Sequence, residues 1–426
     1  MNELLLHYFW KNRLFPTQHL HTTDGRALKL LKTGFPHQDA GPDFKQAVIR
    51  LDDVTWVGDV EIHSRSSDWL RHGHQHDSKY QSVILHVVYQ NDIELNGNFP
   101  TLELKNYVPP SMIAEYEQMS CSTELLPCRN TLSEVSPLQF ASWLSRLAVD
   151  RLSRKQLAVA EIVRNCNDNW QEGAFRTFVT NFGFRTNGPA FELLSKSLPY
   201  RYLLKHKDSR LQVYALVFGQ AGMLEEPLED DEYYRILQAE YSYLRYKYRL
   251  MPIPVKVWNL LRLRPQNFPC VRLAQLSECL YRIPDIIEQI LSNSDVSQLR
   301  AISHFEPHPY WKTHLHFGRD SPEHQCKIGK QTINLLAINV IAPIRLAFSD
   351  FRGDSVGREN ALALLERCDF ENNNITRQYI EAGFPGNHAL YSQALLELHH
   401  NYCSKKRCAE CDIGCLILRK HCKWLK

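Results

Sequence analysis

Residues 41–63 read GPDFKQAVIRLDDVTWVGDVEIH, a short apolar stretch with an aspartate near one end and a Glu-x-His sequence at the other. Two apolar runs flank the turn-like pair Asp52-Asp53, and this pattern predicts two antiparallel strands joined by a tight turn. Buried strands rarely contain acidic residues unless these are paired, capped or bound to a metal, because an unpaired carboxylate in apolar surroundings is costly. The acids of this hairpin therefore need a partner.

The β-rich pattern around the hairpin extends from about residue 26 to about residue 104, and residues 3–11 have the spacing of a short helix in front of it. From about residue 136 to residue 400, helical spacing dominates. We therefore expect an α+β protein of three parts. These are an N-terminal α/β module, a large all-α domain and a small Cys-rich end, at residues 1–115, 116–390 and 391–426.

Length and composition point to a globular protein. The chain has 426 residues, which is too long for one ordinary core, and 44% of them are hydrophobic. The start lacks the pattern of a secretory signal, and no run approaches the roughly 18 consecutive apolar residues of a membrane span. Twelve cysteines, seven of them scattered, are typical here of a reducing, cytoplasmic setting. No Gly-rich phosphate loop is present, so the sequence does not indicate nucleotide-driven or dinucleotide chemistry.

The ends of the predicted hairpin carry the candidate catalytic residues. Folding at the turn brings Asp43, which precedes the first strand, beside Glu61, near the end of the second. Side chains alternate along a strand, so Asp59, Glu61 and His63 share one face. Two carboxylates and a third polar group can hold Mg²⁺ or Mn²⁺ for phosphodiester hydrolysis, with Asp43 and Glu61 as the metal ligands. The alternative is a set of solvated edge acids with Asp43 as a capping residue.

Pro42-Asp43 followed by Glu61-x-His63 resembles the PD-(D/E)xK motif of restriction-endonuclease-like nucleases. The resemblance covers roughly residues 1–105 and implies a restriction-endonuclease-like module that cleaves DNA or RNA with a bound metal ion. The third motif residue is usually a lysine in that superfamily. His63 stands in its place here and can act either as a general base or as a metal ligand. The competing hypothesis is a catalytically silent nucleic-acid-binding or scaffold protein built on the same sheet.

Segments along nearly the whole chain resemble a second group, a family of bacterial proteins catalogued only as a domain of unknown function. The segments that carry this resemblance are GPDF, SSDWLRHGHQHDSKY, VILHVVYQND, RPQNFPCVRLAQL, INLLAINVIAP and YCSKKRCAECDIG. The resemblance supports the domain organisation and implies no activity.

A histidine-rich run, DWLRHGHQHD at residues 68–77, follows the second strand of the hairpin. His74, His76 and Asp77 are candidates for an additional site beside Asp43 and Glu61, as metal ligands, proton donors or phosphate contacts. The alternative is a solvated loop in which Asp77 is a local hydrogen-bond acceptor. His86, inside the apolar run VILHVV, is expected to be a satisfied sheet histidine.

The last 24 residues contain five cysteines, four of them with the spacing C-x4-C-x2-C-x3-C. This spacing predicts one structural Zn²⁺ or, as the rival, an iron–sulfur cluster. Cys415 is the favoured fourth ligand, and Cys422, His399 and His421 remain open. The alternative is an apolar C-terminal helix with free cysteines. The candidate metal ligands are Cys403, Cys408, Cys411 and Cys415.

The same tail carries most of the positive charge. Residues 403–426 contain seven Lys or Arg against two acids, a net +5, whereas the formal net charge of the chain is only +3. Lys405, Lys406 and Arg407 lie inside the predicted ligand loop and are candidate contacts to nucleic-acid phosphates. We expect nucleic acid as the partner and no membrane.

Overall fold

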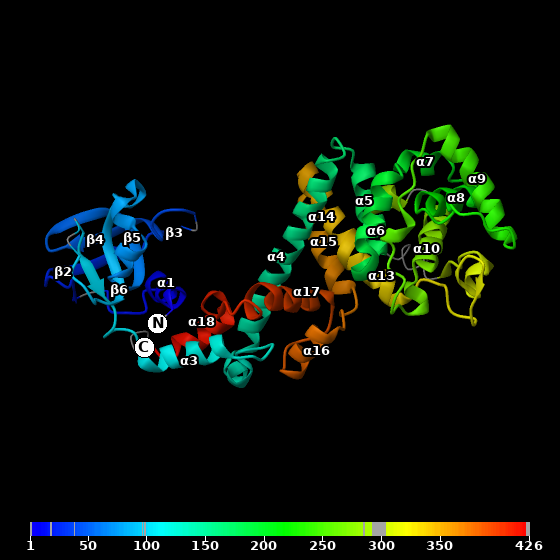
Figure 1. The fold of residues 1–426 in the computed structure, drawn as a ribbon. Coiled ribbons are helices and arrows are strands. Elements are labelled where there is room, and N and C mark those ends of the chain that lie inside the picture. The colour runs from blue at the N-terminus through cyan, green and yellow to red at the C-terminus, as the bar shows by residue number, and fades with distance from the viewer. Residues whose placement is uncertain are drawn as a thin grey trace. The chain divides into compact units, whose positions relative to one another are not determined.

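The computed structural model describes residues 2–17, 19–37, 39–95, 97, 99–283, 286–291 and 304–422 (Figure 1). The chain divides into two compact units, which are described here one at a time. Unit 1 consists of residues 1–144, 374–384 and 395–426, and unit 2 consists of residues 145–373 and 385–394. The Cys-rich tail, expected as a segment of its own, thus lies in the same unit as the N-terminal sheet.

Unit 1 is built on a seven-stranded mixed sheet with the order β1-β2-β4-β5-β6-β7, in which β3 pairs with β4. Strands β4 and β5 are antiparallel, whereas β6 and β7 run parallel to β5. The α+β class is confirmed. The strands are β1 (Leu20–His21), β2 (Ala27–Lys32), β3 (Phe35–Pro36), β4 (Phe44–Leu51), β5 (Val54–Arg65), β6 (Val83–Gln90) and β7 (Thr101–Glu103).

The predicted helix in front of the sheet is confirmed as α1 (Glu3–Lys11). Asn2 caps its N-terminus by accepting a hydrogen bond from the backbone N–H of Leu4 at 2.9 Å. Phe9 and Trp10 are fully buried and belong to the same apolar cluster as the strands. Helix α1 therefore packs on the sheet beside β5.

Short helices follow β5 and lead into β6, because a parallel pair of strands requires a crossover connection. These are α2 (Asp68–Arg71) and the 3-10 helices η1 (His74–His76) and η2 (Ser78–Tyr80). The other elements that lie in unit 1 are α3 (Pro110–Cys121), η3 (Arg129–Glu134), α16 (Asn374–Glu381), the π-helix η9 (His399–Cys403), η10 (Cys408–Glu410) and α18 (Asp412–Arg419).

The C-terminal tail packs into the core of unit 1. Cys408, Leu418 and Cys422 are buried in the same apolar cluster as the strands and α3. Tyr8 on α1 donates its hydroxyl hydrogen to the backbone oxygen of Cys415 at 2.9 Å. The two ends of the chain thus stabilise one core.

Unit 2 is mainly helical, as expected. It also contains a two-stranded sheet, β8 (His314–His316) and β9 (Arg319–Asp320), so the expectation of an all-α domain was wrong in this detail. The turn between these strands uses Gly318 at φ +64°, a conformation that glycine adopts without steric cost. Helices α4 (Pro137–Arg164) and α17 (Ala389–Leu398) have residues in both units.

The remaining described helices of unit 2 are short to medium in length. They are α5 (Trp170–Phe182), α6 (Phe184–Ser197), α7 (Tyr200–Lys205), α8 (Arg210–Gln220), α9 (Glu232–Tyr248), η4 (Val255–Val257), η5 (Pro265–Asn267), α10 (Pro269–Arg282), α11 (Ile286–Leu291), η7 (Pro309–Lys312), α13 (Lys330–Leu336), η8 (Ala337–Ile341), α14 (Ala342–Arg352) and α15 (Ser355–Arg367).

One continuous helical stretch, Lys330–Arg352, is long and apolar enough by length and composition alone to cross a membrane. Its most apolar window is 72% buried inside the protein. That degree of burial is the property of a core helix, so this stretch is weak evidence for a membrane span.

Candidate functional site

The turn of the β4–β5 hairpin sets a strand register that by itself would not bring Asp43 beside Glu61. Ala47 pairs with Gly58 next to the turn-proximal pairs of the hairpin. Continued without interruption, this register would place Asp43 opposite Ile62. Because a one-residue change of register moves a side chain to the other face of a sheet, Asp43 would then point away from Glu61.

A β-bulge at Gln46 corrects the register. Gln46 has φ +57°, and beyond it Phe44 pairs with Val60. The extra residue turns the strand so that Asp43 lies beside Glu61, where the backbone N–H of Asp43 donates to Oε2 of Glu61 at 3.1 Å. Bulges commonly re-aim side chains next to functional sites. The sequence predicted the meeting of the two carboxylates but not the bulge that brings it about.

Asp59 holds the bulge in place. Its Oδ1 accepts the backbone N–H of Gln46 at 3.1 Å, and its Oδ2 accepts hydrogen bonds from Lys45 Nζ at 2.9 Å and Ser82 Oγ at 2.6 Å. Asp59 was expected on the face of Glu61 without a role of its own. It is buried, both of its carboxylate oxygens accept hydrogen bonds, and it joins β4 to the start of β6.

We predict that Asp59→Ala lowers the free energy of unfolding by about 2 kcal/mol, because it leaves the Lys45 ammonium, the Ser82 hydroxyl and the Gln46 backbone N–H without their acceptor. Urea denaturation measures the change. The matched control is Asp53→Ala in the exposed turn of the same hairpin, which should be near neutral. Equal stability of the two variants would contradict the anchoring role.

The carboxylates of Asp43 and Glu61 form the centre of the site. Asp43 Oδ2 accepts the backbone N–H of Ile62 at 2.9 Å, and Nε2 of His7 on α1 lies 3.2 Å from the same oxygen. Burial, and after it the nearby charge of Asp43, raise the pKa of Glu61 to about 9. The pair is therefore electrostatically unfavourable until a cation or a proton lies between the two groups.

His63 lies at the buried end of the site and is 2% exposed. Its Nδ1 is 2.9 Å from Nε2 of His86, and its Nε2 is 3.2 Å from Nδ1 of His72 and 3.4 Å from Oε1 of Glu61. Burial and the neighbouring histidines lower the pKa of His63 to about 2, and burial lowers that of His86 to about 3. Both rings are thus neutral at physiological pH, and both nitrogens of His63 have partners.

The crossover between β5 and β6 supplies a further ligand candidate. Gly73 at φ +75° turns the chain, and Nε2 of His74 then lies 3.3 Å from Oε1 of Glu61. The ring of His74 stacks on Tyr80 with centroids 3.8 Å apart. His76 and Asp77 are exposed, and Asp77 accepts the backbone N–H of Lys79 as the cap of η2. Of the three residues predicted here, only His74 has a contact with Glu61.

Three histidines of the site were not predicted as site residues. His7 comes from α1, and nothing in its local sequence indicates a contact with Asp43. His72 was part of the histidine-rich run but was not singled out. His86 occupies the sheet position expected for it. Its contact with His63 depends on the parallel register, which pairs His86 with Glu61.

The cysteines of the tail gather with one cysteine from far earlier in the chain. Cys403, Cys408 and Cys411 are buried, and all twelve cysteines are free of disulfides. Burial raises the pKa of Cys128, which precedes η3, and the neighbouring Cys403, Cys411 and Cys408 thiols raise it further. Sγ of Cys415 instead donates to the backbone oxygen of Ala409 at 3.1 Å. Cys128 is thus near enough to these three thiols to interact with them electrostatically, as Cys415 is to Cys411.

The backbone around Cys411 is shaped for a sulfur ligand. Burial raises the pKa of Cys411 to about 11, against backbone hydrogen bonds from Gly414 and Ile413 that lower it. A Cβ atom on Gly414 would lie 2.1 Å from the backbone oxygen of Cys408, so only glycine fits where α18 meets η10. Backbone N–H groups that point at a thiolate are a recurrent feature of sulfur-bound metal sites.

The basic residues of the ligand loop differ in whether an acidic side chain already pairs with them. Lys405 is exposed and its Nζ bonds the Oδ1 of Asn401 at 3.0 Å, while Lys406 bonds the backbone oxygen of Glu124. Arg407 forms a two-point ion pair with Glu410. The positive charge available to a partner at this loop is thus carried mainly by the two lysines.

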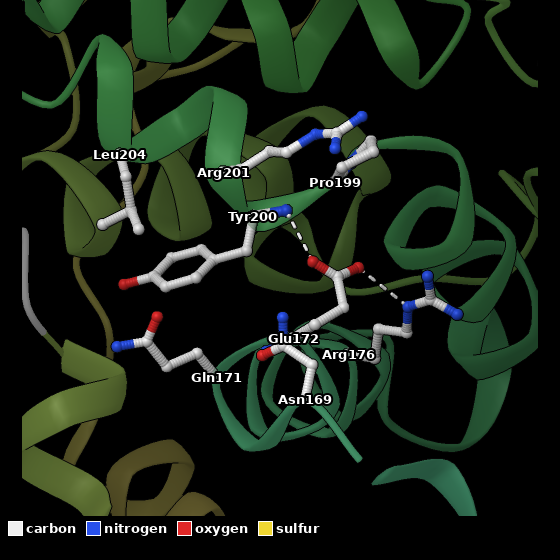
Figure 2. A pocket seen from close by; sticks show the side chains of 8 residues that line it. All are labelled: Asn169, Gln171, Glu172, Arg176, Pro199, Tyr200, Arg201 and Leu204. Carbon is white, nitrogen blue, oxygen red and sulfur yellow. Dashed lines mark hydrogen bonds and ion pairs between the residues drawn. The ribbon is translucent and has the colours of Figure 1, made fainter. Parts of the chain in front are cut away.

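A separate polar pocket lies in unit 2, with a cavity of about 230 Å³ between α5 and α7 (Figure 2). Its acid, Glu172, accepts the backbone N–H of Tyr200 and the Nε of Arg176, each at 2.9 Å. These bonds join the two helices. Glu172 therefore has a structural role that accounts for its place in the pocket.

No curated protein and no solved structure matches the chain. The family described as "Protein of unknown function (DUF2851)" matches residues 3–374, which include the hairpin, the histidine-rich run and most of unit 2. The resemblance to a family of unknown function, inferred from the sequence, is confirmed. The chain belongs to the DUF2851 family.

Proposed function

We propose that this protein is a metal-dependent nuclease that hydrolyses phosphodiester bonds of DNA or RNA, with Asp43 and Glu61 as ligands of Mg²⁺ or Mn²⁺. The proposal rests chiefly on the hydrogen bond of 3.1 Å from the Asp43 backbone to Glu61 and on the electrostatic influence of the Asp43 carboxylate on Glu61, which raises the pKa of Glu61. The mixed sheet with an antiparallel hairpin and a parallel crossover agrees with the restriction-endonuclease-like resemblance.

A divalent ion held here would polarise the phosphoryl group and lower the pKa of the attacking water. The residues of the chain prepare that site. The Ile62 N–H fixes the orientation of the Asp43 carboxylate, and the Asp43 N–H fixes that of Glu61. His63 is buried with both nitrogens engaged, so it is less free to orient an attacking water than the lysine common in the superfamily.

The direct test is cleavage by purified protein of single- and double-stranded DNA and RNA with Mg²⁺ or Mn²⁺. Products that form with the metal and are absent with chelator support the proposal. An intact substrate in every combination would set the nuclease aside. The catalytically silent binding protein would then be the better description. The presence of His63 where the superfamily usually has a lysine also favours that alternative.

We predict that nucleic-acid binding weakens steeply with salt. If the two lysines of the ligand loop each make one phosphate contact, a fourfold rise in salt should lower the affinity for mixed-sequence DNA or RNA by about 12-fold. The Lys405→Ala, Lys406→Ala double variant should flatten this salt dependence. The control is Lys29→Ala with Lys32→Ala, an exposed pair on β2. Binding that does not depend on salt would count against both functional alternatives.

We also propose that the tail holds one structural Zn²⁺ through Cys403, Cys408, Cys411 and Cys128, with an iron–sulfur cluster as the rival. These four thiols would supply the ligand number that tetrahedral zinc requires. The metal would fix the loop that carries Lys405 and Lys406.

A further inference from the structure

We infer that the site binds one transition-metal ion, Zn²⁺ in preference to Mg²⁺, in a cage formed by His63, His72, His74 and Glu61. One nitrogen from each histidine lies within 4.8 Å of the nitrogens of the other two. The inference adds a metal ligand set to the proposed nuclease site, and a catalytic role of this ion rests on the proposed function. Metal binding itself does not depend on that function.

The distances agree with tetrahedral coordination. For ligand bonds of 2.0–2.1 Å, the edge of a tetrahedron is about 3.3–3.4 Å. Nε2 of His63 and Nε2 of His74 lie 3.4 and 3.3 Å from the same oxygen, Oε1 of Glu61. Nε2 of His63 lies 3.2 Å from Nδ1 of His72. Two of the six edges of the cage therefore have the length that an ion at its centre requires, and a third is about 0.1 Å shorter.

The ligand set determines which metal fits. Mg²⁺ prefers oxygen ligands and keeps several waters, whereas imidazole nitrogens suit zinc and its neighbours in the first transition series. Glu61 has one oxygen toward the histidines and the other toward Asp43, whose backbone N–H it accepts. The carboxylate therefore reaches both the proposed cage and the proposed catalytic pair.

His86 is a positioning residue for this cage. Its Nε2 lies 2.9 Å from Nδ1 of His63, on the side of the ring opposite the cage. When the Nδ1–H of His63 donates to His86, the lone pair of His63 Nε2 points to the cage. Histidine ligands of metals commonly donate their second ring N–H to an acceptor in this way, which fixes the tautomer and the ring orientation.

The competing explanation is a network of hydrogen bonds without metal, since His72 and His63 can bond to each other directly. The two explanations differ in metal content. Chelator-treated full-length protein is titrated with Zn²⁺ and with Co²⁺, and bound metal is counted per chain. We expect the His72→Ala, His74→Ala double variant to bind one equivalent less than wild type. His76→Ala, an exposed histidine of the same turn, should match wild type.

Cobalt spectra separate this cage from the cysteine tail. The equivalent lost in the double variant should carry d–d bands without thiolate-to-cobalt charge transfer, since its ligands are nitrogen and oxygen. The single variant His72→Ala, altered at an exposed position, should lower affinity by at least about 10-fold even if the double variant folds poorly. Equal metal content and affinity in wild type and folded His72→Ala protein would overturn the inference.

The result is independent of nuclease activity. A protein that binds the additional equivalent through His72 and His74 but cleaves no nucleic acid supports the cage and rejects the proposed function. A protein that cleaves with Mg²⁺ while both histidine variants keep full metal content and activity supports the proposed function and rejects the cage.

Discussion

Asp43→Asn and Glu61→Gln are each expected to reduce metal-dependent cleavage by about a thousandfold. Each substitution preserves side-chain size and deletes one ligand charge, and a bound metal ion stabilises the transition state by several kcal/mol, of which about 4 kcal/mol corresponds to that factor. Single-turnover cleavage rates at saturating Mn²⁺ measure the effect. Nucleic-acid affinity should stay within about twofold of wild type, because the basic loop of the tail is unchanged.

The structure also predicts how these variants fold. The pKa of Glu61 is raised by burial and by Asp43, so the metal-free protein takes up a proton on Glu61 when it folds at neutral pH, which lowers its stability. Glu61→Gln needs no such proton and should leave the metal-free protein at least as stable as wild type. A loss of activity is therefore not a consequence of unfolding.

Asp53→Asn is the matched control for these variants, because Asp53 lies on the same hairpin at its exposed turn. It should cleave like wild type. Asp43→Asn or Glu61→Gln protein that keeps wild-type rates would show that the carboxylates hold no catalytic ion. The sheet would then be a platform for binding.

The hairpin shows which part of the site could be predicted from sequence. The Asp52-Asp53 turn and the alternation of β5 are local patterns, and they were sufficient to place Asp43 and Glu61 at the same end of the sheet. The bulge at Gln46 was not predictable in the same way. It depends on the hydrogen bond that the Gln46 backbone N–H donates to Asp59. It also depends on a glycine in the preceding turn, because a Cβ on Gly34 would lie 2.7 Å from the backbone oxygen of Lys45.

The histidine contacts show the same limit. The histidine-rich run was recognised, but which of its members reach Glu61 depends on the turn at Gly73 and on the parallel pairing of β5 with β6. Spacing favoured His76 and Asp77 as strongly as His74. Hydrogen bonding within the turn leaves Asp77 as a cap, and this choice is made by the fold of the crossover rather than by residue type.

The cysteine tail illustrates a contact that no local spacing reveals. C-x4-C-x2-C predicted three ligands and favoured Cys415 as the fourth because it is the next cysteine in the chain. Helix α18 begins at Asp412, directly after Cys411, and Sγ of Cys415 on that helix bonds the Ala409 backbone. Cys128, which precedes η3, comes near the tail where η3 contacts α18, so it is the fourth ligand that we propose.

Cys128→Ser is accordingly expected to remove the tail metal and to lower the free energy of unfolding by roughly 3–5 kcal/mol, part of the about 10–16 kcal/mol that structural zinc binding supplies in small zinc domains. Elemental analysis gives the zinc and iron content, and denaturant unfolding gives the stability. Cys415→Ser is the matched control and should keep both, because its sulfur bonds Ala409. Cys408→Ser should behave like Cys128→Ser. If Cys415→Ser loses the metal while Cys128→Ser keeps it, the ligand set predicted from spacing is the correct one, and Cys128 is only a buried neighbour.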